Sequence, residues 1–208
     1  MEQNNIPDIV VRRLPAYLQV LLHLKNKGVM TTSSKELGDI LGLSAAQIRK
    51  DFSHFGEFGK QGTGYSITYL IDQLTNILNV NRVWDIVLIG AGDLGHAIAR
   101  YQGFQNRGFR IQAVFDIDPA KIGEQIGDFS IRDMSSLPDY IHDHNIKIAM
   151  LTVPSSTAQQ VAEALIKAGI RSILSYAPIT LNLPPETCYI EYINPILQLQ
   201  HMTYYLGK

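Results

Sequence analysis

The chain has 208 residues, of which 46% are hydrophobic and 18% charged, so its composition is that of an ordinary globular protein with one large domain or two modest ones. This composition excludes intrinsic disorder, and no apolar run approaches the roughly 18 residues of a membrane span. The N-terminus lacks the apolar stretch of a secretory signal, and Cys188 is a single cysteine without a partner for a disulfide or a metal, so a soluble cytoplasmic protein is expected. The formal net charge of −1 argues against broad electrostatic binding to nucleic acid, but it allows a local basic face.

Up to Asn81 the pattern is helical with one turn-rich interruption. Spacing and end signals predict three short helices, at residues 16–28, 33–42 and 44–56. A serine cap followed by Glu36 opens the second helix, Ser44 opens the third, and Gly42-Leu43-Ser44 is the link between them. The glycine-rich residues 56–67 predict a β-hairpin, or wing, before a last helix at 67–80.

From about Arg82 onward, short apolar runs alternate with helical patterns. The predicted strands are residues 84–90, 110–116, 146–153, 170–177 and 187–193. Their near-continuous hydrophobicity is typical of parallel strands that are covered on both faces. Between two of them, Val161, Leu165 and Ile166 have helical spacing and Gly169 is a stop signal, which predicts a crossover helix. This half is predicted to be a doubly wound α/β domain, with a boundary near residues 80–83.

The first of these strands runs into a glycine fingerprint, "DIVLIGAGDLGHAI" at residues 85–98. Gly90 permits a tight turn, Gly92 lets the backbone approach a pyrophosphate, and Gly95 lets the next helix pack on the strand. Asp116 lies 21 residues past Gly95, close to the roughly 20 expected for the carboxylate that binds the adenosine ribose. Beyond the loop, one apolar helical face is supplied by Leu94, Ala97, Ile98 and Tyr101. The context predicts a dinucleotide site.

The charge of Asp116 favours NAD(H) over NADP(H), because it would repel a 2′-phosphate. The alternative is that Asp116 only caps a strand-end turn with Asp118 and Pro119. Asp93 is an unexpected residue for a phosphate loop, and whether it faces solvent or a ribose stays open. Further along the chain, Thr152 and Pro154 are candidate neighbours of the ribose or nicotinamide at the same sheet edge, although Pro154 is also explained as the end of the strand.

Residues for redox catalysis are not evident in this sequence. A dehydrogenase needs a proton donor or acceptor beside the nicotinamide, and the six histidines do not form a persuasive set. A Tyr-x-x-x-Lys spacing occurs at Tyr204 to Lys208, where no further chain fixes the lysine, and chance explains it better. The protein is therefore predicted not to be an enzyme.

Two short helices joined by a tight link and followed by a wing are the parts of a winged helix-turn-helix. In the second of these helices, donors for the major groove are Gln47, Arg49, Lys50, Ser53 and His54, while Ala46, Ile48 and Phe52 face the domain. Candidate phosphate contacts are Arg12, Arg13, Ser34, Lys35 and Lys60. The alternative is a solvated face of an all-α interaction module, and Asp51 and Glu57 weaken the basic character.

Taken together, "TTSSKELGDILGLSAAQIRKDFSHFGEFGKQGTGY", "GAGDLGHAIARYQGF", "FDIDPAKIG", "LTVP" and "GIRSILSYAP" resemble the redox-sensing transcriptional repressor family Rex, over almost the entire chain. The resemblance implies an N-terminal winged helix-turn-helix domain at 1–81, a Rossmann-type NAD(H) domain at 82–193, and a terminal helix at 194–208 that is exchanged between subunits of a homodimer. It also implies binding of a palindromic DNA operator, with release favoured by NADH. The cofactor contacts predicted from the fingerprint and the resemblance are Gly90, Ala91, Gly92, Asp93, Leu94, Gly95, Tyr101, Asp116, Ile117, Lys121, Thr152, Val153 and Pro154.

Two positions depart from the family pattern. The family commonly has an arginine where Gln19 stands and an aspartate where Asn194 stands, and both belong to a switch network with a tyrosine that matches Tyr101. Replacing both charges leaves a hydrogen-bondable amide pair rather than an orphan ion. We therefore expect a weaker contact in the NAD⁺-favoured, DNA-binding arrangement.

Two other classes of function remain open from the residues. The chain would fit a small NAD-dependent oxidoreductase with a helical dimerisation module. It would also fit a nucleotide-binding interaction protein that holds CoA and binds a protein through its helical half. Turnover of NADH would support the first, and failure to retain duplex DNA the second.

Overall fold

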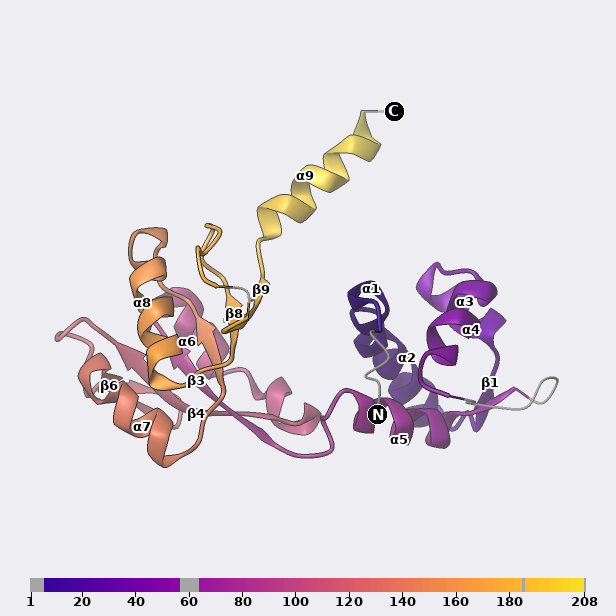
Figure 1. The fold of residues 1–208 in the computed structure, drawn as a ribbon, viewed down its shortest axis with the longest axis horizontal. Coiled ribbons are helices and arrows are strands. Elements are labelled where there is room, and N and C mark those ends of the chain that lie inside the picture. The colour runs from indigo at the N-terminus through magenta and orange to yellow at the C-terminus, as the bar shows by residue number, and fades with distance from the viewer. Residues whose placement is uncertain (1–5, 57–63, 185, 208) are drawn as a thin grey trace. The chain divides into compact units, whose positions relative to one another are not determined.

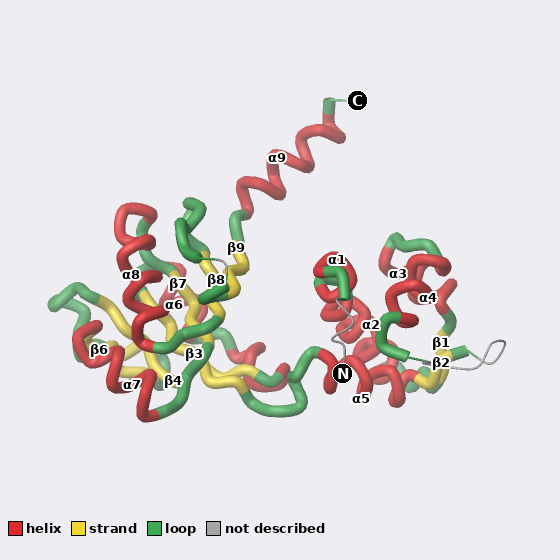
Figure 2. The backbone as a smooth tube through the Cα atoms, viewed as in Figure 1, coloured by secondary structure: helices red, strands yellow, loops and turns green. Residues whose placement is uncertain are grey.

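The computed structural model describes residues 6–56, 64–184 and 186–207. It consists of two compact units, residues 1–82 and 83–208 (Figures 1 and 2).

The first unit is a small helical bundle. Its elements are α1 (Asp8–Val11), α2 (Leu14–Asn26), β1 (Thr31–Thr32), α3 (Ser34–Leu41), α4 (Ala45–Ser53), β2 (Tyr65–Ser66) and α5 (Ile67–Ile77). Its core is formed by Leu14, Tyr17, Leu21, Leu37, Ile48, Phe52, Ile67, Leu70, Ile71 and Leu74. These residues come from four helices, α2, α3, α4 and α5, which bury their apolar stripes against one another.

The α3–α4 junction follows from local chemistry. Ser33 and Glu36 form the reciprocal capping box at the start of α3, with hydrogen bonds of 3.1 and 2.8 Å. The helix ends at Gly42, whose φ of 69° is left-handed. Gly38 lies against the link, because a Cβ there would be 2.4 Å from the carbonyl oxygen of Leu43. The tight helix-turn-helix predicted from the sequence is confirmed, and Gly38 explains how closely the link packs.

The predicted wing falls mainly on residues 57–63, outside the described residues. What the structure describes is its base, where β1 and β2 pair antiparallel with Thr31 opposite Ser66 and Thr32 opposite Tyr65. The short strand β1 was not predicted.

The second unit is a doubly wound α/β fold. Its elements are β3 (Trp84–Ile89), α6 (Asp93–Ala99), η1 (Gln102–Arg107), β4 (Phe109–Asp116), β5 (Gln125–Ile126), β6 (Phe129–Asp133), η2 (Met134–Ser136), α7 (Leu137–Asp143), β7 (Ile148–Leu151), α8 (Ser155–Ala168), β8 (Ser172–Ser175), β9 (Tyr189–Tyr192) and α9 (Pro195–Leu206).

The sheet order is β5-β6-β4-β3-β7-β8-β9, parallel throughout except for the antiparallel pair β5 and β6. Starting from β3, the chain builds outward through β4 and β6, then returns to β7 on the other side of β3. Without β5, this is the 3-2-1-4-5-6 order of dinucleotide-binding folds. The order reverses between β3 and β7, and ligands of such sheets bind at the carboxyl ends of the strands at this point.

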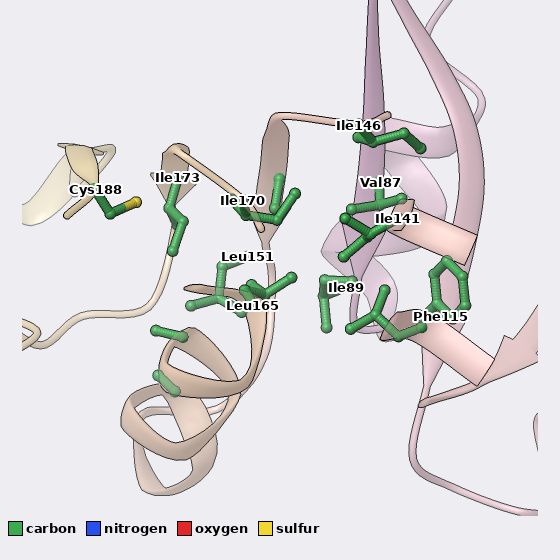
Figure 3. Packing of buried hydrophobic residues seen from close by; sticks show 14 of the residues in the cluster. Val87, Ile89, Phe115, Ile141, Ile146, Leu151, Leu165, Ile170, Ile173 and Cys188 are labelled. Atoms are coloured by element: carbon green, nitrogen blue, oxygen red, sulfur yellow. The ribbon is translucent and has the colours of Figure 1, made fainter. Parts of the chain in front are cut away.

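Alternate residues of β3 face two different cores. Val87 and Ile89 pack with Phe115 and with residues of α7 and α8 such as Ile141 and Leu165 (Figure 3). On the other side, Ile86 and Leu88 pack with Ile98 and Ala99 of α6. Both faces of the sheet are therefore covered, as the hydrophobic strands predicted.

Some local predictions were wrong. The hairpin of β5 and β6 was missed because β5 has only two residues, and because β6 carries one buried residue, Ile131, among polar neighbours instead of a continuous apolar run. The buried face of α6 consists of Gly95, Ile98 and Ala99, whereas Leu94 is 45% exposed and the apolar face had been placed on it.

Candidate functional site

The three glycines after β3 have three different environments. Gly90 has a φ of 102°, and a Cβ there would be 2.8 Å from the carbonyl oxygen of Thr152. A Cβ at Gly95 would be 2.0 Å from the carbonyl oxygen of Gly90, so α6 packs this closely against the turn because residue 95 has no side chain. Around Gly92 a Cβ would meet no atom within 4 Å. The loop is thus closely packed at its two ends and open at Gly92, where the absence of a side chain lets a pyrophosphate come close to the protein backbone.

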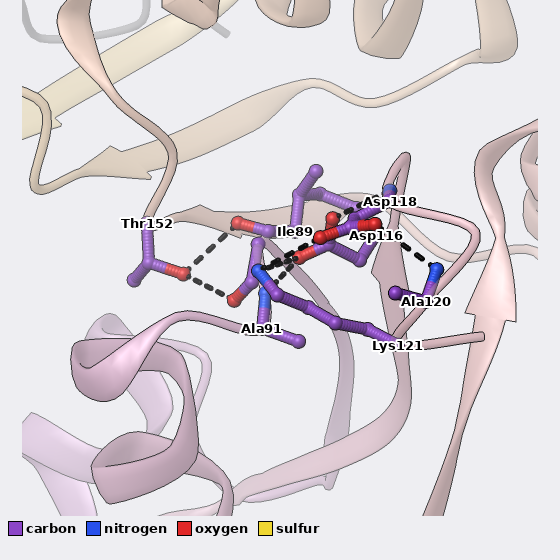
Figure 4. A network of polar contacts seen from close by, with 8 residues as sticks. Ile89, Ala91, Asp116, Asp118, Ala120, Lys121 and Thr152 are labelled. Atoms are coloured by element: carbon purple, nitrogen blue, oxygen red, sulfur yellow. Dashed lines mark hydrogen bonds and ion pairs between the residues drawn. The ribbon is translucent and has the colours of Figure 1, made fainter. Parts of the chain in front are cut away.

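Asp116, at the end of β4, ties the glycine loop to the next turn (Figure 4). Its Oδ2 accepts a hydrogen bond from the N–H of Ala91 at 2.7 Å, and its Oδ1 accepts one from the N–H of Asp118 at 2.9 Å. The Nζ of Lys121 lies 3.5 Å from Oδ2. Asp116 therefore makes the local turn that was the alternative interpretation, and it also orders the loop.

The carboxylate is 8% exposed and charged. Burial by itself raises the pKa of Asp116, but the N–H groups of Asp118 and Ala91 and the ammonium of Lys121 outweigh it, so the pKa lies below its ordinary value. Each carboxylate oxygen has two lone pairs. Oδ2 accepts the N–H of Ala91 and the ammonium of Lys121, whereas among the described residues Oδ1 accepts the N–H of Asp118 alone. Oδ1 therefore keeps one acceptor site, and Asp116 lines a pocket.

Thr152 fastens the end of β7 to the end of β3. Its hydroxyl lies 2.9 Å from the carbonyl oxygen of Ile89 and 2.8 Å from that of Gly90 (Figure 4). A hydroxyl has one proton to donate, and here that donor is used within the scaffold of the loop. The oxygen also has two lone pairs, so it can meet a ligand as an acceptor but not as a donor.

A pocket of about 670 Å³ opens at the carboxyl ends of β3, β4, β7 and β8. It is lined by Ile89, Gly90, Gly92, Asp93, Leu94, Asp116, Ile117, Asp118, Lys121, Met134, Thr152, Val153, Pro154, Thr157, Gln160, Val161, Ala164 and Tyr176. Most predicted cofactor residues are brought together here. The face of α8 was missed, although Thr157, Val161 and Ala164 have helical spacing that would have predicted it.

Three predicted cofactor residues do not line this pocket. Ala91 and Gly95 are buried in the loop scaffold. Tyr101 is 56% exposed and packs edge-to-face on Phe104 with centroids 5.1 Å apart. The prediction placed it on the face of α6, but that helix ends at Ala99, so the chain turns before Tyr101 is reached.

In the first unit, α4 presents two opposite faces. Ala46, Arg49, Lys50 and Ser53 are exposed, whereas Ile48, Asp51 and Phe52 are buried. Arg49 donates to the hydroxyl of Ser34 at 3.1 Å, which joins the exposed face to the start of α3. Ala46, predicted to face the domain, is instead exposed.

Two predicted DNA contacts are engaged inside the unit. The guanidinium of Arg13 and the amide of Gln47 both donate to the buried carboxylate of Asp51. Asp51 was expected to weaken the basic face, but it lies on the buried face and is paired. Of the other predicted phosphate contacts, Arg12 forms an exposed ion pair with Asp8 at 2.6 Å, and Lys35 is exposed. His54 is half-buried, and Lys60 lies outside the described residues.

The two departures from the family pattern lie in different units. Gln19 is exposed on α2. Asn194 caps α9, because its Oδ1 accepts the N–H of Ile196 at 3.1 Å.

Within the described part of the chain, no helix has the length and apolar composition to cross a membrane. The same residues contain no group of three or more histidine, cysteine, aspartate or glutamate side chains placed to hold a metal ion.

Models of known protein families match parts of both units. A family model described as "CoA binding domain" matches residues 81–179, and one described as "Putative DNA-binding protein N-terminus" matches residues 5–53. The redox-sensing transcriptional repressor Rex of Chloroflexus aggregans is 49% identical over 97% of this chain and 95% of its own length. That of Clostridioides difficile is 42% identical over 98% of this chain and 97% of its own length.

Solved structures agree with these relatives. The crystal structure of RSP with β-NAD⁺ and operator DNA matches with a TM-score of 0.92 and 36% identity, over 99% of this chain and 94% of that one. RSP with β-NADH matches with a TM-score of 0.88 and 35% identity, over 99% and 96%. Full-length identity of this degree, on the same order of elements, shows that the chain belongs to the Rex family of redox-sensing transcriptional repressors.

Proposed function

We propose that this protein is a homodimeric repressor that binds a palindromic operator in the cytoplasm and releases it when NADH occupies the pocket of unit 83–208. One observation carries the proposal: a single chain joins a helix-turn-helix with an exposed basic face to a pocket at the switch point of a dinucleotide-type sheet. The Rex-family repressor RSP has been crystallised with NAD⁺ and operator DNA, and with NADH. We assign the pocket to sensing rather than to catalysis.

NAD(H) fits the residues that line the pocket. Its volume of about 670 Å³ lies within the roughly 300–1,000 Å³ of small-molecule sites. The open side of Gly92 admits the pyrophosphate, and the charged carboxylate of Asp116 accepts ribose hydroxyls while repelling a 2′-phosphate. The remaining contacts we propose are Gly90, Asp93, Leu94, Ile117, Lys121, Thr152, Val153 and Pro154.

DNA binding is assigned to the exposed face of α4 and its surroundings. Arg49, Lys50 and Ser53 share that face and supply donors to base edges, with His54 at its end. Arg12, Ser34, Lys35 and Lys60 are the proposed phosphate contacts. Arg13 and Gln47 are withdrawn from this set because Asp51 holds them.

In this proposal each of three segments of the chain has its own role. Residues 1–81 read DNA, residues 82–193 hold the nucleotide, and the helix at 194–208 is exchanged with the partner subunit. The apolar side chains of α9 support the exchange, since they are exposed in the single chain, with fractions of 54% for Leu199, 59% for Met202 and 85% for Leu206.

The switch is a population shift between dimer arrangements that do and do not match the operator. NADH drives it only through a higher affinity for the released arrangement. The reduced nicotinamide ring is neutral, whereas the oxidised ring carries a positive charge that is costly to bury without a partner. We propose that Tyr101 contacts the ring region within the dimer.

The test is fluorescence anisotropy of a labelled palindromic duplex, selected from a random pool with this protein. It is titrated at fixed protein and salt with NADH, and then in separate arms with NAD⁺, NADPH and CoA. Release by NADH alone supports the proposal. Release by CoA alone would overturn the choice of nucleotide, and absence of duplex binding in every arm would overturn the repressor function.

A further inference from the structure

A buried carboxylate that accepts four hydrogen bonds lies on the inner face of α4. Asp51 is 0% exposed and adjoins the hydrophobic core residues Ile48 and Phe52. Its Oδ2 accepts hydrogen bonds from Nε of Arg13 at 2.6 Å and from the hydroxyl of Tyr17 at 2.5 Å. Its Oδ1 accepts from Nη2 of Arg13 and from Nε2 of Gln47, both at 2.7 Å. An ionised carboxylate has about four acceptor sites, so the protein fills all of them.

These bonds connect two helices that are remote in the sequence. Arg13 is the residue before α2 and Tyr17 lies in its first turns, four residues on, so both project from one side of that helix. The ring of Tyr17 also packs edge-to-face on Phe52, with centroids 5.3 Å apart. One face of α4 is therefore held to α2 by an ion pair, a hydroxyl and an aromatic contact.

The network is charged under ordinary conditions. Burial raises the pKa of Asp51, but the hydrogen bonds from Arg13, Tyr17 and Gln47 together bring it below the ordinary value. Burial and the bond to Asp51 raise the pKa of Tyr17, so its hydroxyl stays a donor. Such a hydrogen-bonded ion pair has a defined geometry, because each N–H or O–H donor must point at its own carboxylate oxygen.

We propose that Asp51 is the positioning residue of the DNA-reading helix: held by Arg13 and Tyr17, it fixes the rotation of α4 about its axis. Arg49, Lys50 and Ser53 then point outward together, because they are exposed on α4 when Asp51 is buried against α2. This inference rests on the proposed function, since it assigns a role within the same DNA-binding surface. Asp51, Arg13 and Tyr17 themselves do not contact DNA.

Simple electrostatics makes the opposite prediction. If the charge of Asp51 only repelled DNA, its removal would strengthen binding to every duplex. If Asp51 positions α4, its removal weakens binding to the operator selectively. In Asp51→Asn an NH₂ group replaces one carboxylate oxygen. Two donors of the network point at each oxygen, so the two hydrogen bonds to the replaced oxygen are lost.

The experiment compares Asp51→Asn with Asp72→Asn in the full-length protein. Asp72 is exposed on α5, and the two substitutions change the net charge equally. Binding to the selected operator and to a scrambled duplex is measured by anisotropy, with NADH binding and circular dichroism as checks on folding. We expect Asp51→Asn to lose about tenfold or more in operator affinity, with affinity for the scrambled duplex retained or raised. Asp72→Asn is expected to resemble the wild type.

A milder pair keeps the test decisive if Asp51→Asn does not fold. Tyr17→Phe removes one hydroxyl from the network, and Tyr69→Phe removes one from the exposed surface of α5. Tyr17→Phe should lower operator affinity without changing its salt dependence, because no phosphate contact is lost. Equal operator affinities for Tyr17→Phe and Tyr69→Phe, or tighter operator binding by folded Asp51→Asn, would overturn the inference.

The two proposals fail in different ways. If the wild type binds no duplex, the proposed function fails, and hydrogen exchange of residues 45–53 then decides about Asp51. Faster exchange there in Tyr17→Phe than in Tyr69→Phe supports its positioning role, and equal exchange rejects it.

Discussion

At the scale of single residues, Gly95 is required for the packing of the fold, whereas Gly92 is required for nucleotide binding in the proposed function. An alanine at Gly95 meets the carbonyl oxygen of Gly90 at 2.0 Å, whereas one at Gly92 meets nothing within 4 Å. We expect Gly95→Ala to lower the free energy of unfolding of unit 83–208 by about 1–3 kcal/mol. Gly92→Ala should change it by less than about 0.5 kcal/mol yet weaken NADH binding, because its methyl occupies the pyrophosphate approach. Urea unfolding followed by Trp84 fluorescence, with an NADH titration, measures both; unchanged NADH affinity in Gly92→Ala would contradict this placement.

Asp116 makes the stability of the same unit depend on pH. Its folded pKa is lowered, so its contribution is present above the unfolded value of about 3.9 and is lost as pH falls through the folded value. Asp116→Asn should cost about 1.5–3 kcal/mol at pH 7, and its free energy of unfolding should fall less than that of the wild type below about pH 4. Urea unfolding at stepwise pH, read by Trp84, tests this. Asp128→Asn, at an exposed hairpin turn, is the control, and an identical acid dependence in all three proteins would refute it.

At the scale of elements, α4 is an amphipathic helix whose outer face is polar and whose inner face carries a buried ion pair. If Lys50 on the outer face lies in the DNA interface, its ammonium displaces a counterion from the phosphates beside the bases that it contacts, so Lys50→Gln should reduce the slope of log affinity against log salt by about 1. Lys167→Gln, on the exposed side of α8, makes the same charge change away from this surface. Anisotropy titrations at several salt concentrations give the slopes. Equal slopes for the two variants would remove Lys50 from the interface.

At the scale of the whole molecule, α9 points to assembly. Its exposed apolar residues Leu199, Met202 and Leu206 recur with helical spacing, and burying them against a partner is favourable. Leu199→Glu should therefore shift the protein from dimer to monomer in sedimentation equilibrium. Gln200→Glu adds the same charge on another side of the helix and should leave the dimer intact. A dimer that withstands Leu199→Glu would place the subunit interface elsewhere.

The response to NAD⁺ belongs to the same scale, because Gln19 and Asn194 lie in different units. We expect Gln19→Arg with Asn194→Asp to strengthen the effect of NAD⁺ on operator binding, since a charge pair replaces two amides. Aspartate caps a helix as well as asparagine does, so α9 is retained. The single variants are the controls, each leaving one unpaired charge. An operator response to NAD⁺ that is the same in the double variant and the wild type would end this hypothesis.

Local patterns in the sequence determined the element order, the helix-turn-helix, the parallel sheet and the glycine loop. Hydrophobic spacing, caps such as Ser33 and Ser44, and the glycines act over a few residues, so they can be read directly along the chain. Short strands such as β5 carry too few residues for such a pattern, and they were missed.

Only the tertiary structure decided which polar groups are partners. Arg13 and Asp51 are 38 residues apart, and no local signal indicates that the arginine neutralises the aspartate rather than contacting DNA. Likewise, Tyr176 and the face of α8 join the pocket because parallel crossovers bring separate strand ends to one edge. The sequence by itself therefore determined the kinds of element and their order, while packing between distant segments decided which side chains are left exposed for a ligand, since a polar group paired inside the fold is no longer available outside it.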